Sequence, residues 1–206
     1  MSAATSSAAP APGPAPRRLD GEPWRLVQDW LPPNDEPERP QLTLSTVTPD
    51  GRADARTVLL TAFDADGFSF HTDARSRKAA QLAANPAVAL TLLWPGFTRQ
   101  LVVQGTAEPA PAEEVAAAYR SRSPYLQQLA WQNTAEFARL PAPERLARWR
   151  EHARAHPDGW TQPPTWAGYR VRPTRLSFWQ GSPDTASLRT EFTATPGGWQ
   201  VSHLPG

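Results

Sequence analysis

A serine followed by two basic residues, Ser76-Arg77-Lys78, opens a helical segment directly after a predicted strand. Such a serine can cap a helix, and the free backbone N–H groups of a first helical turn can bind an anion such as phosphate. Arg77 and Lys78 add two positive charges, and Arg56 on a neighbouring predicted strand could add a bidentate contact. The cluster therefore predicts a phosphate site. A solvated basic helix start without a ligand is the commoner meaning of so short a motif.

A second group of residues lies near the C-terminus, where Phe178-Trp179-Gln180-Gly181 precedes Arg189. A tryptophan can form one wall of a site for a flat aromatic ligand, and an arginine can neutralise charge on that ligand's ring. The alternative is a core tryptophan with a surface arginine, which is the default in a chain with nine tryptophans.

The other reactive residue types form no recognised catalytic or metal-binding pattern. His152 and His156 lie four apart on a predicted helix, a spacing that can hold a metal, but no HExxH motif surrounds them. We therefore expect no metal site. The chain has no cysteine, which excludes disulfides, thiolate nucleophiles and iron–sulfur clusters. It also lacks the G-x-S-x-G motif of a hydrolase nucleophile.

The overall charge and hydropathy exclude several kinds of partner. A formal net charge of +1 gives no electrostatic reason to expect nucleic acid. No segment approaches the ~20 apolar residues that cross a bilayer, and the N-terminus lacks the apolar run of a signal peptide. The absence of cysteine suits a reducing compartment. We expect a cytoplasmic protein that binds a small molecule, not nucleic acid or a membrane.

The chain divides into a short tail and one domain. Residues 1–18 consist largely of Ala, Pro and Ser without periodicity, which predicts a disordered tail. Residues 19–206 have the length and apolar content for a single domain with a packed core. This domain begins with an amphipathic helix over residues 22–31, ended by Pro32-Pro33.

Short strands and tight turns dominate the rest of the chain. Apolar/polar alternation predicts strands over residues 42–48, 55–60, 68–72, 88–93, 100–105, 166–171, 176–179, 188–194 and 199–203. Helical periodicity predicts helices over residues 77–84, 112–119, 130–139 and 143–155. Strands, a helical insertion and strands again indicate an α+β fold with a mainly antiparallel sheet. Six or more short strands favour a barrel, because closure removes exposed edges.

Read in order, these segments resemble the pyridoxamine 5'-phosphate oxidase family, the FMN-binding split barrels. The resemblance extends from Trp24 to Pro205, and its markers share the order and spacing of the family's motifs. They include Leu44-Ser45-Thr46-Val47, Arg56-Thr57-Val58-Leu59-Leu60, Gly67-Phe68-Ser69-Phe70-His71-Thr72, Ser76-Arg77-Lys78, Trp166-Ala167-Gly168-Tyr169-Arg170 and Phe178-Trp179-Gln180-Gly181. The resemblance implies a split β-barrel of the α+β class, with six or more mainly antiparallel strands and peripheral helices.

The resemblance also implies how FMN would be held. The basic cluster would bind the FMN phosphate, the backbone after Arg56 would line the isoalloxazine, and the C-terminal group would contact the flavin ring or its edges. His71 and Thr72 take the place of a Tyr-Thr or Phe-Thr pair. The implied cofactor-binding residues are Arg56, Thr57, Val58, Leu59, His71, Thr72, Ser76, Arg77, Lys78, Gln100, Trp179 and Arg189. In the family these sites lie at a dimer interface, so a homodimer would hold two flavins.

The substrate half of the site departs from the family pattern. Family members that oxidise pyridoxamine phosphate carry a lysine after the Val-Leu-Leu run, where this chain has Thr61. They carry Arg-Leu-His after Trp-Gln-Gly, where this chain has Thr185 and Ser187 in place of the Arg and the His. A serine for the substrate phosphate falls at Leu126. Each lost charge-assisted hydrogen bond is worth about 1.5–3 kcal/mol, so affinity for that substrate should be low.

Two substrate-binding positions of the family pattern remain, Tyr119 and Arg122, whereas a Gln-Ser pair that reaches FMN is missing near Ala135 and Glu136. We therefore expect an FMN-dependent oxidase or dehydrogenase that accepts a hydride at flavin N5 from another small organic substrate. No catalytic side chain is identifiable. The alternatives are a genuine pyridoxamine 5'-phosphate oxidase with an altered pocket and a non-enzymatic split-barrel protein that binds flavin or haem.

Overall fold

The structure, a computed structural model, describes residues 14–206. The helices are α1 (Gly21–Trp30), α2 (Arg77–Ala84), α3 (Ala112–Arg120), α4 (Pro124–Gln132), α5 (Ala135–Arg139) and α6 (Ala142–Ala155), with a 3-10 turn at Pro95–Phe97. The strands are β1 (Gln41–Val47), β2 (Ala53–Leu59), β3 (Ala62–Asp64), β4 (Gly67–Asp73), β5 (Ala87–Leu93), β6 (Arg99–Pro109), β7 (Trp166–Gln180), β8 (Leu188–Thr195) and β9 (Gly198–Pro205).

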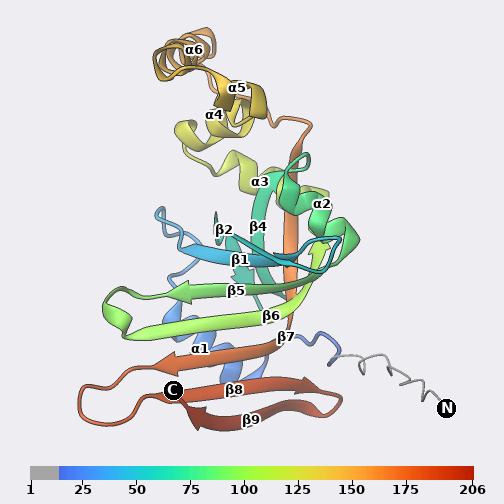
Figure 1. The fold of residues 1–206 in the computed structure, drawn as a ribbon, viewed down its shortest axis with the longest axis vertical. Coiled ribbons are helices and arrows are strands. Elements are labelled where there is room, and N and C mark those ends of the chain that lie inside the picture. Colours follow the sequence, from blue (N-terminus) through green and yellow to red (C-terminus); the bar gives the residue numbers. More distant parts are fainter. Residues whose placement is uncertain (1–13) are drawn as a thin grey trace, which may run out of the picture.

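All nine strands belong to one antiparallel sheet in the order β2-β1-β5-β6-β7-β4-β3, with β8 and β9 added beside β7. Strand β7 is 15 residues long: its first part pairs with β4 and its last part with β8, while β6 pairs along most of its length. The sheet curls around this strand (Figure 1). The predicted α+β class and split-barrel fold are confirmed.

One hydrophobic core fills the curl of the sheet. Leu44, Leu90, Val103 and Leu176 lie opposite one another on four successive strands, and each is fully buried. They come from alternating apolar positions, which point to one face of a strand. Helix α1 packs onto the same core through residues such as Val27. This core holds in position the strands whose ends form the candidate site.

The structure corrects two predicted elements. The strands expected over residues 166–171 and 176–179 are one strand, β7, because its proline, Pro173, lies opposite Gly105 at a bulge that tolerates a residue without an N–H. A Cβ on Gly105 would lie 2.1 Å from the carbonyl oxygen of Arg172, so glycine is needed there. The single helix expected over residues 130–139 is two helices, because the Thr134 hydroxyl accepts the Phe137 N–H and starts α5.

The predicted tail over residues 1–18 lies mostly outside the described residues. Within its last part, the Arg17 N–H donates to the Pro173 carbonyl oxygen over 3.0 Å, and the Arg18 carbonyl oxygen accepts from the Trp199 indole over 3.2 Å. Leu19 is buried in the core. The boundary at residue 18 remains a prediction.

Helices α3 to α6 extend from one end of the sheet, beyond β4 and α2 (Figure 1). The amide of Gln128 on α4 donates to the Trp149 carbonyl oxygen on α6 over 2.7 Å, which ties these two helices together. None of the described helices is both long enough and apolar enough to cross a membrane. Helix α4 stands over the end of β2 and β4, where the candidate site lies.

Candidate functional site

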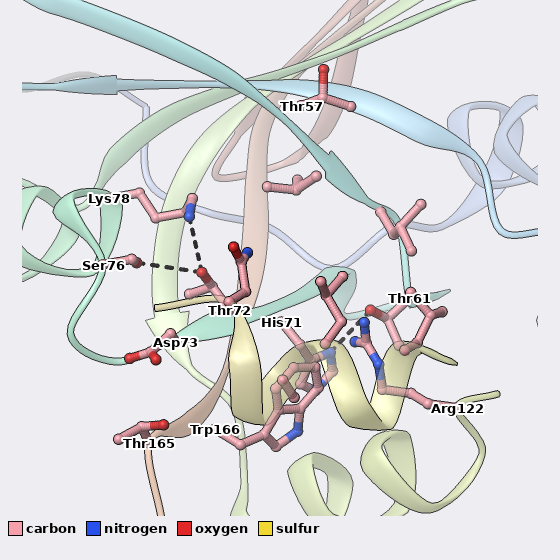
Figure 2. Close-up of a pocket in the computed structure, with 16 residues that line it drawn as sticks. Thr57, Thr61, His71, Thr72, Asp73, Ser76, Lys78, Arg122, Thr165 and Trp166 are labelled. Carbon is pink, nitrogen blue, oxygen red and sulfur yellow. Dashed lines mark hydrogen bonds between the residues drawn. The ribbon is translucent and has the colours of Figure 1, made fainter. Parts of the chain in front are cut away.

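A pocket of about 280 Å³ lies between the end of β2, strand β4, the start of α2, and helix α4 (Figure 2). Residues predicted from separate motifs meet in it. Its lining includes Thr57, Val58, Leu59, Thr61, His71, Thr72, Ser76, Lys78 and Arg122. The antiparallel register of the sheet and the short β4–α2 connection bring these segments together. Nine of the predicted cofactor and substrate positions therefore line one continuous cavity.

The basic end of the pocket is built at the start of α2. The Ser76 hydroxyl caps the helix by accepting the Ala79 N–H, and it lies 3.3 Å from the Thr72 hydroxyl. The Lys78 ammonium donates to the same Thr72 hydroxyl over 3.0 Å (Figure 2). Burial, followed by the charge of Arg56, lowers the pKa of Lys78. A cation, a hydroxyl pair and free helix N–H groups thus converge on one spot, which suits a phosphate.

Arg56 and Arg77 stand beside this end of the pocket and contact a residue that the sequence analysis missed. The Asp54 carboxylate forms ion pairs with Arg56, at 2.8 Å from its Nη2, and with Arg77, at 2.9 Å from its Nε. Asp54 precedes Arg56 by two positions on β2, so both point to the same face, and this spacing could have revealed the pair. Roles for both arginines in phosphate binding remain predictions.

The other end of the pocket is aromatic. The His71 ring stacks on the Trp166 indole, with centroids 5.2 Å apart and planes within 7°. The Arg122 guanidinium lies over the same indole at 4.4 Å from the ring centroid. His71 Nδ1 and the Thr61 hydroxyl lie 3.0 Å apart and share a hydrogen bond (Figure 2). Trp166, which the sequence offered only as a marker of the family resemblance, also forms a wall of the pocket.

The His71 imidazole adds no charge to this aromatic end, where Arg122 is the cation. Burial, followed by the charge of Arg122, lowers the pKa of His71 to about 4, so its imidazole is neutral at neutral pH. Leu126 and Leu129 of α4 add an apolar wall. Tyr119 lies behind the wall: it is buried, packs edge-on against Trp166 and donates to the Gln127 carbonyl oxygen. This end can therefore hold a flat, largely apolar group.

The remaining predicted residues lie elsewhere on the same chain. Gln100 and Arg189 line a separate hollow across β6, β7 and β8. Trp179 lies between them in the sheet register. Thr185 and Ser187 belong to the β7–β8 connection, where the Thr185 N–H donates to the Ser182 hydroxyl over 3.3 Å. Within one chain, these five residues do not line the pocket at α2.

Replacing His71 by phenylalanine should reduce the pH dependence of stability. In the unfolded chain histidine has its ordinary pKa of 6.5, whereas in the folded chain the pKa of His71 is about 4. The unfolded state therefore binds the extra proton first, and the free energy of unfolding falls as pH drops from 6.5 to 4. We expect His71→Phe to remove roughly 2 kcal/mol of that fall, after allowance for partial exposure. Urea unfolding of both proteins at pH 7.5 and 4.5 measures the free energy of unfolding at each pH. An equal fall in this free energy for the parent and for His71→Phe would contradict this expectation.

The pyridoxamine 5'-phosphate oxidase family model matches residues 34–180, and the model of the pyridoxine 5'-phosphate oxidase C-terminal dimerisation region matches residues 166–205. The pyridoxine/pyridoxamine 5'-phosphate oxidase of Caulobacter vibrioides is 36% identical over 93% of this chain and 88% of its own length. That of Rubrobacter xylanophilus is 40% identical over 79% of this chain and 76% of its own.

Solved structures show the same fold. PhzG from Burkholderia lata, in complex with tetrahydrophenazine-1-carboxylic acid, superposes with a TM-score of 0.76 and 25% identity over 90% of this chain and 93% of its own. A pyridoxamine 5'-phosphate oxidase-related, FMN-binding protein from Nostoc punctiforme has a TM-score of 0.64 at 18% identity, covering 80% of this chain and 86% of its own.

Proposed function

Because the chain belongs to the pyridoxamine 5'-phosphate oxidase family, we propose that it is an FMN-dependent oxidase or dehydrogenase for a planar organic substrate with one negative charge. The family resemblance and the oxidoreductase class are confirmed by the relatives, which are named oxidases. The chain also carries the family's dimerisation region.

The basic end of the pocket supports FMN as the cofactor. Lys78, the Ser76–Thr72 hydroxyl pair and the free N–H groups of α2 would hold its phosphate. The backbone of Thr57, Val58 and Leu59 borders the same cavity and would line the isoalloxazine. Bound FMN would supply an acceptor for two electrons, taken from the substrate as a hydride.

A second copy of the chain would complete the site. Gln100, Trp179 and Arg189 lie in neighbouring register on β6, β7 and β8, away from the pocket of their own chain. Trp179 and Arg189 fall within the matched dimerisation region. In a homodimer these residues would reach the flavin held by the partner, with the Arg189 charge favouring the reduced, anionic ring.

One observation carries the substrate assignment: Arg122 is the only permanent cation that lines the aromatic end of the pocket among the described residues. Thr61 shares its hydroxyl with the neutral His71, so neither offers a charge to a phosphate ester. A dianionic phosphate would bind weakly here, because the other cationic partners that such a group needs are missing. A single carboxylate would be neutralised by Arg122 alone. The Trp166 and Leu126 walls favour a flat ring system for the rest of the substrate.

The solved structure of PhzG favours the same substrate class. Its ligand, tetrahydrophenazine-1-carboxylic acid, is a partly reduced ring system with one carboxylate. Loss of a hydride and a proton from such a ring forms a new double bond and moves it towards aromaticity. We propose that the natural substrate shares this chemistry: a planar, partly reduced ring with a single acidic group.

A genuine pyridoxine/pyridoxamine 5'-phosphate oxidase is the second candidate, and the names of relatives at 36–40% identity favour it. Anaerobic mixing of the FMN-loaded protein with each compound separates the two. We expect tetrahydrophenazine-1-carboxylic acid to bleach the flavin absorbance with a larger kcat/KM than pyridoxine or pyridoxamine 5'-phosphate. Faster bleaching by the vitamin B6 phosphates would establish the second candidate and overturn the substrate proposal.

Removing the Ser76 cap should affect both stability and cofactor binding. The Ser76 hydroxyl caps α2 and lies against Thr72, so Ser76→Ala should lower the free energy of unfolding by about 1 kcal/mol. It should also weaken FMN binding several-fold. Ser123→Ala is a matched control, because the Ser123 hydroxyl caps α4 in the same way. Urea unfolding and FMN titration measure both effects. Equal FMN affinity in the two variants would contradict a role for Ser76 in the site.

A further inference from the structure

Two arginines beside the phosphate end of the pocket, Arg56 and Arg77, form ion pairs with a carboxylate of the same chain. Asp54 Oδ2 forms ion pairs with Arg56 Nη2 at 2.8 Å and with Arg77 Nε at 2.9 Å, and it accepts a hydrogen bond from the Gln81 side-chain amide over 2.8 Å. Its other oxygen accepts from Arg77 Nη2 over 3.4 Å. The Asp54 and Arg56 side chains are each only 18% exposed, so water screens this pair weakly.

Three hydrogen bonds and one ion pair leave Arg56 little capacity for a ligand. A guanidinium has five N–H donors. Arg56 Nη1 donates to the Thr46 hydroxyl over 2.6 Å and to the Leu44 carbonyl oxygen over 3.4 Å. Its Nη2 donates to the Gln81 amide oxygen over 2.8 Å and lies 2.8 Å from the Asp54 carboxylate in an ion pair. A bidentate contact from Arg56 to a phosphate would therefore displace the Asp54 carboxylate from Nη2 or break one of these hydrogen bonds.

The Gln81 side chain holds Asp54 and Arg56 in position. Its side chain is buried on α2, its amide nitrogen donates to Asp54, and its amide oxygen accepts from Arg56 and from the Thr46 hydroxyl. The hydrogen bond from Gln81, followed by the charges of Arg56 and Arg77, lowers the pKa of Asp54. The carboxylate thus keeps its negative charge at neutral pH and stays fixed beside the start of α2.

A fixed negative charge at this position has a direct electrostatic consequence. A phosphate dianion at the start of α2 would be attracted by Lys78 but repelled by Asp54 across a poorly screened distance. Asp54 also neutralises part of the charge of Arg56 and Arg77 that would otherwise attract the phosphate. The hydroxyls and the helix N–H groups are unaffected by this competition.

We propose that Asp54 is a built-in competitor of the cofactor phosphate, which lowers the affinity of the chain for FMN and makes the flavin exchangeable. The inference rests on the proposed FMN site at α2. In this arrangement Lys78, the Ser76–Thr72 pair and the helix start supply the main phosphate contacts, while Arg56 holds Asp54 and the sheet together. Asp54 is thus a specificity-determining residue that acts on the phosphate and not on the flavin ring.

The test compares FMN with riboflavin, which has the same ring but no phosphate. Asp54→Asn keeps the shape of the side chain and removes its charge. We expect it to tighten FMN binding about tenfold and to leave riboflavin binding unchanged, as read from the quenching of flavin fluorescence. Asp54→Glu, which keeps the charge, should not tighten FMN binding. Asp50→Asn is a control for net charge, since Asp50 pairs with Arg52 at the turn between β1 and β2.

The outcomes separate this inference from the function on which it rests. If FMN binds the parent protein but Asp54→Asn leaves its affinity equal or weaker, Asp54 orients the arginines for the phosphate and the inference is overturned. If neither the parent nor any variant binds FMN, the proposed function itself fails. Circular dichroism verifies the fold of each variant. Asp54→Ser carries the same expectation, so an Asp54→Asn protein that does not fold leaves the inference testable.

Discussion

Replacing Arg77 and Lys78 together by alanine should weaken FMN binding by at least about 3 kcal/mol, which is more than a hundredfold in Kd. Each charged hydrogen bond to the phosphate contributes about 1.5–3 kcal/mol. Lys78 is half-buried and faces the pocket, whereas the Arg77 side chain is 78% exposed and held by Asp54. We therefore expect Lys78→Ala alone to account for more than half of the loss.

Fluorescence titration of the single and double variants with FMN measures this effect, and unchanged affinity in the double variant would remove the phosphate assignment. Lys78 is the only lysine of the chain, which provides a second readout. Acylation of Lys78 by an amine-reactive reagent, followed by mass spectrometry, should be slowed by FMN but not by riboflavin. Arg52→Ala is a suitable control for net charge, because Arg52 is exposed and pairs with Asp50 in the turn between β1 and β2.

Restoring three family residues, by Thr61→Lys, Thr185→Arg and Ser187→His, should strengthen binding of pyridoxal 5'-phosphate by about 4 kcal/mol, close to a thousandfold. Thr61 lines the pocket next to His71, so a lysine there would bring a second cation to the end where Arg122 lies. Thr185 and Ser187 lie outside the pocket of their own chain, so their contribution depends on the dimer.

Isothermal titration of the parent, the triple variant and two partial variants tests this expectation. Thr61→Lys alone should gain about tenfold, because it acts within one chain. Thr185→Arg with Ser187→His should gain affinity only if the partner brings these positions to the pocket. A triple variant no better than the parent would show that the pocket differs from a vitamin B6 site in more than these residues.

Local signals predicted the elements that depend on local chemistry. Helix α2 begins at Arg77 and ends at Ala84, as expected, because Ser76 caps it and Asn85-Pro86 ends it. The continuity of β7 through Pro173 could not be predicted, because it depends on the bulge opposite Gly105 on a distant strand. Strand β3 was also missed, since three residues carry too little periodicity to be read from sequence.

In the candidate site, too, the residues on local motifs were predicted, whereas the contacts between distant segments were not. Motifs on β2, β4 and α2 were predicted and meet in the pocket, since the order of motifs follows the order of elements. The contacts that determine the charge in and around the pocket were not predicted. Asp54 meets Arg77 only through the packing of α2 on the β1–β2 hairpin, and Trp166 meets His71 only through the pairing of β4 with β7. Such contacts join residues far apart in the sequence, so no local pattern reports them.

Titration of the purified chain with FMN and, separately, with riboflavin tests most directly whether the start of α2 holds the phosphate of a flavin cofactor. We expect saturable quenching of FMN fluorescence at one FMN per chain, with riboflavin bound about a hundredfold more weakly because it cannot engage Lys78 and the helix start. Equal affinities for the two flavins, or no binding of FMN, would contradict the assignment of this pocket.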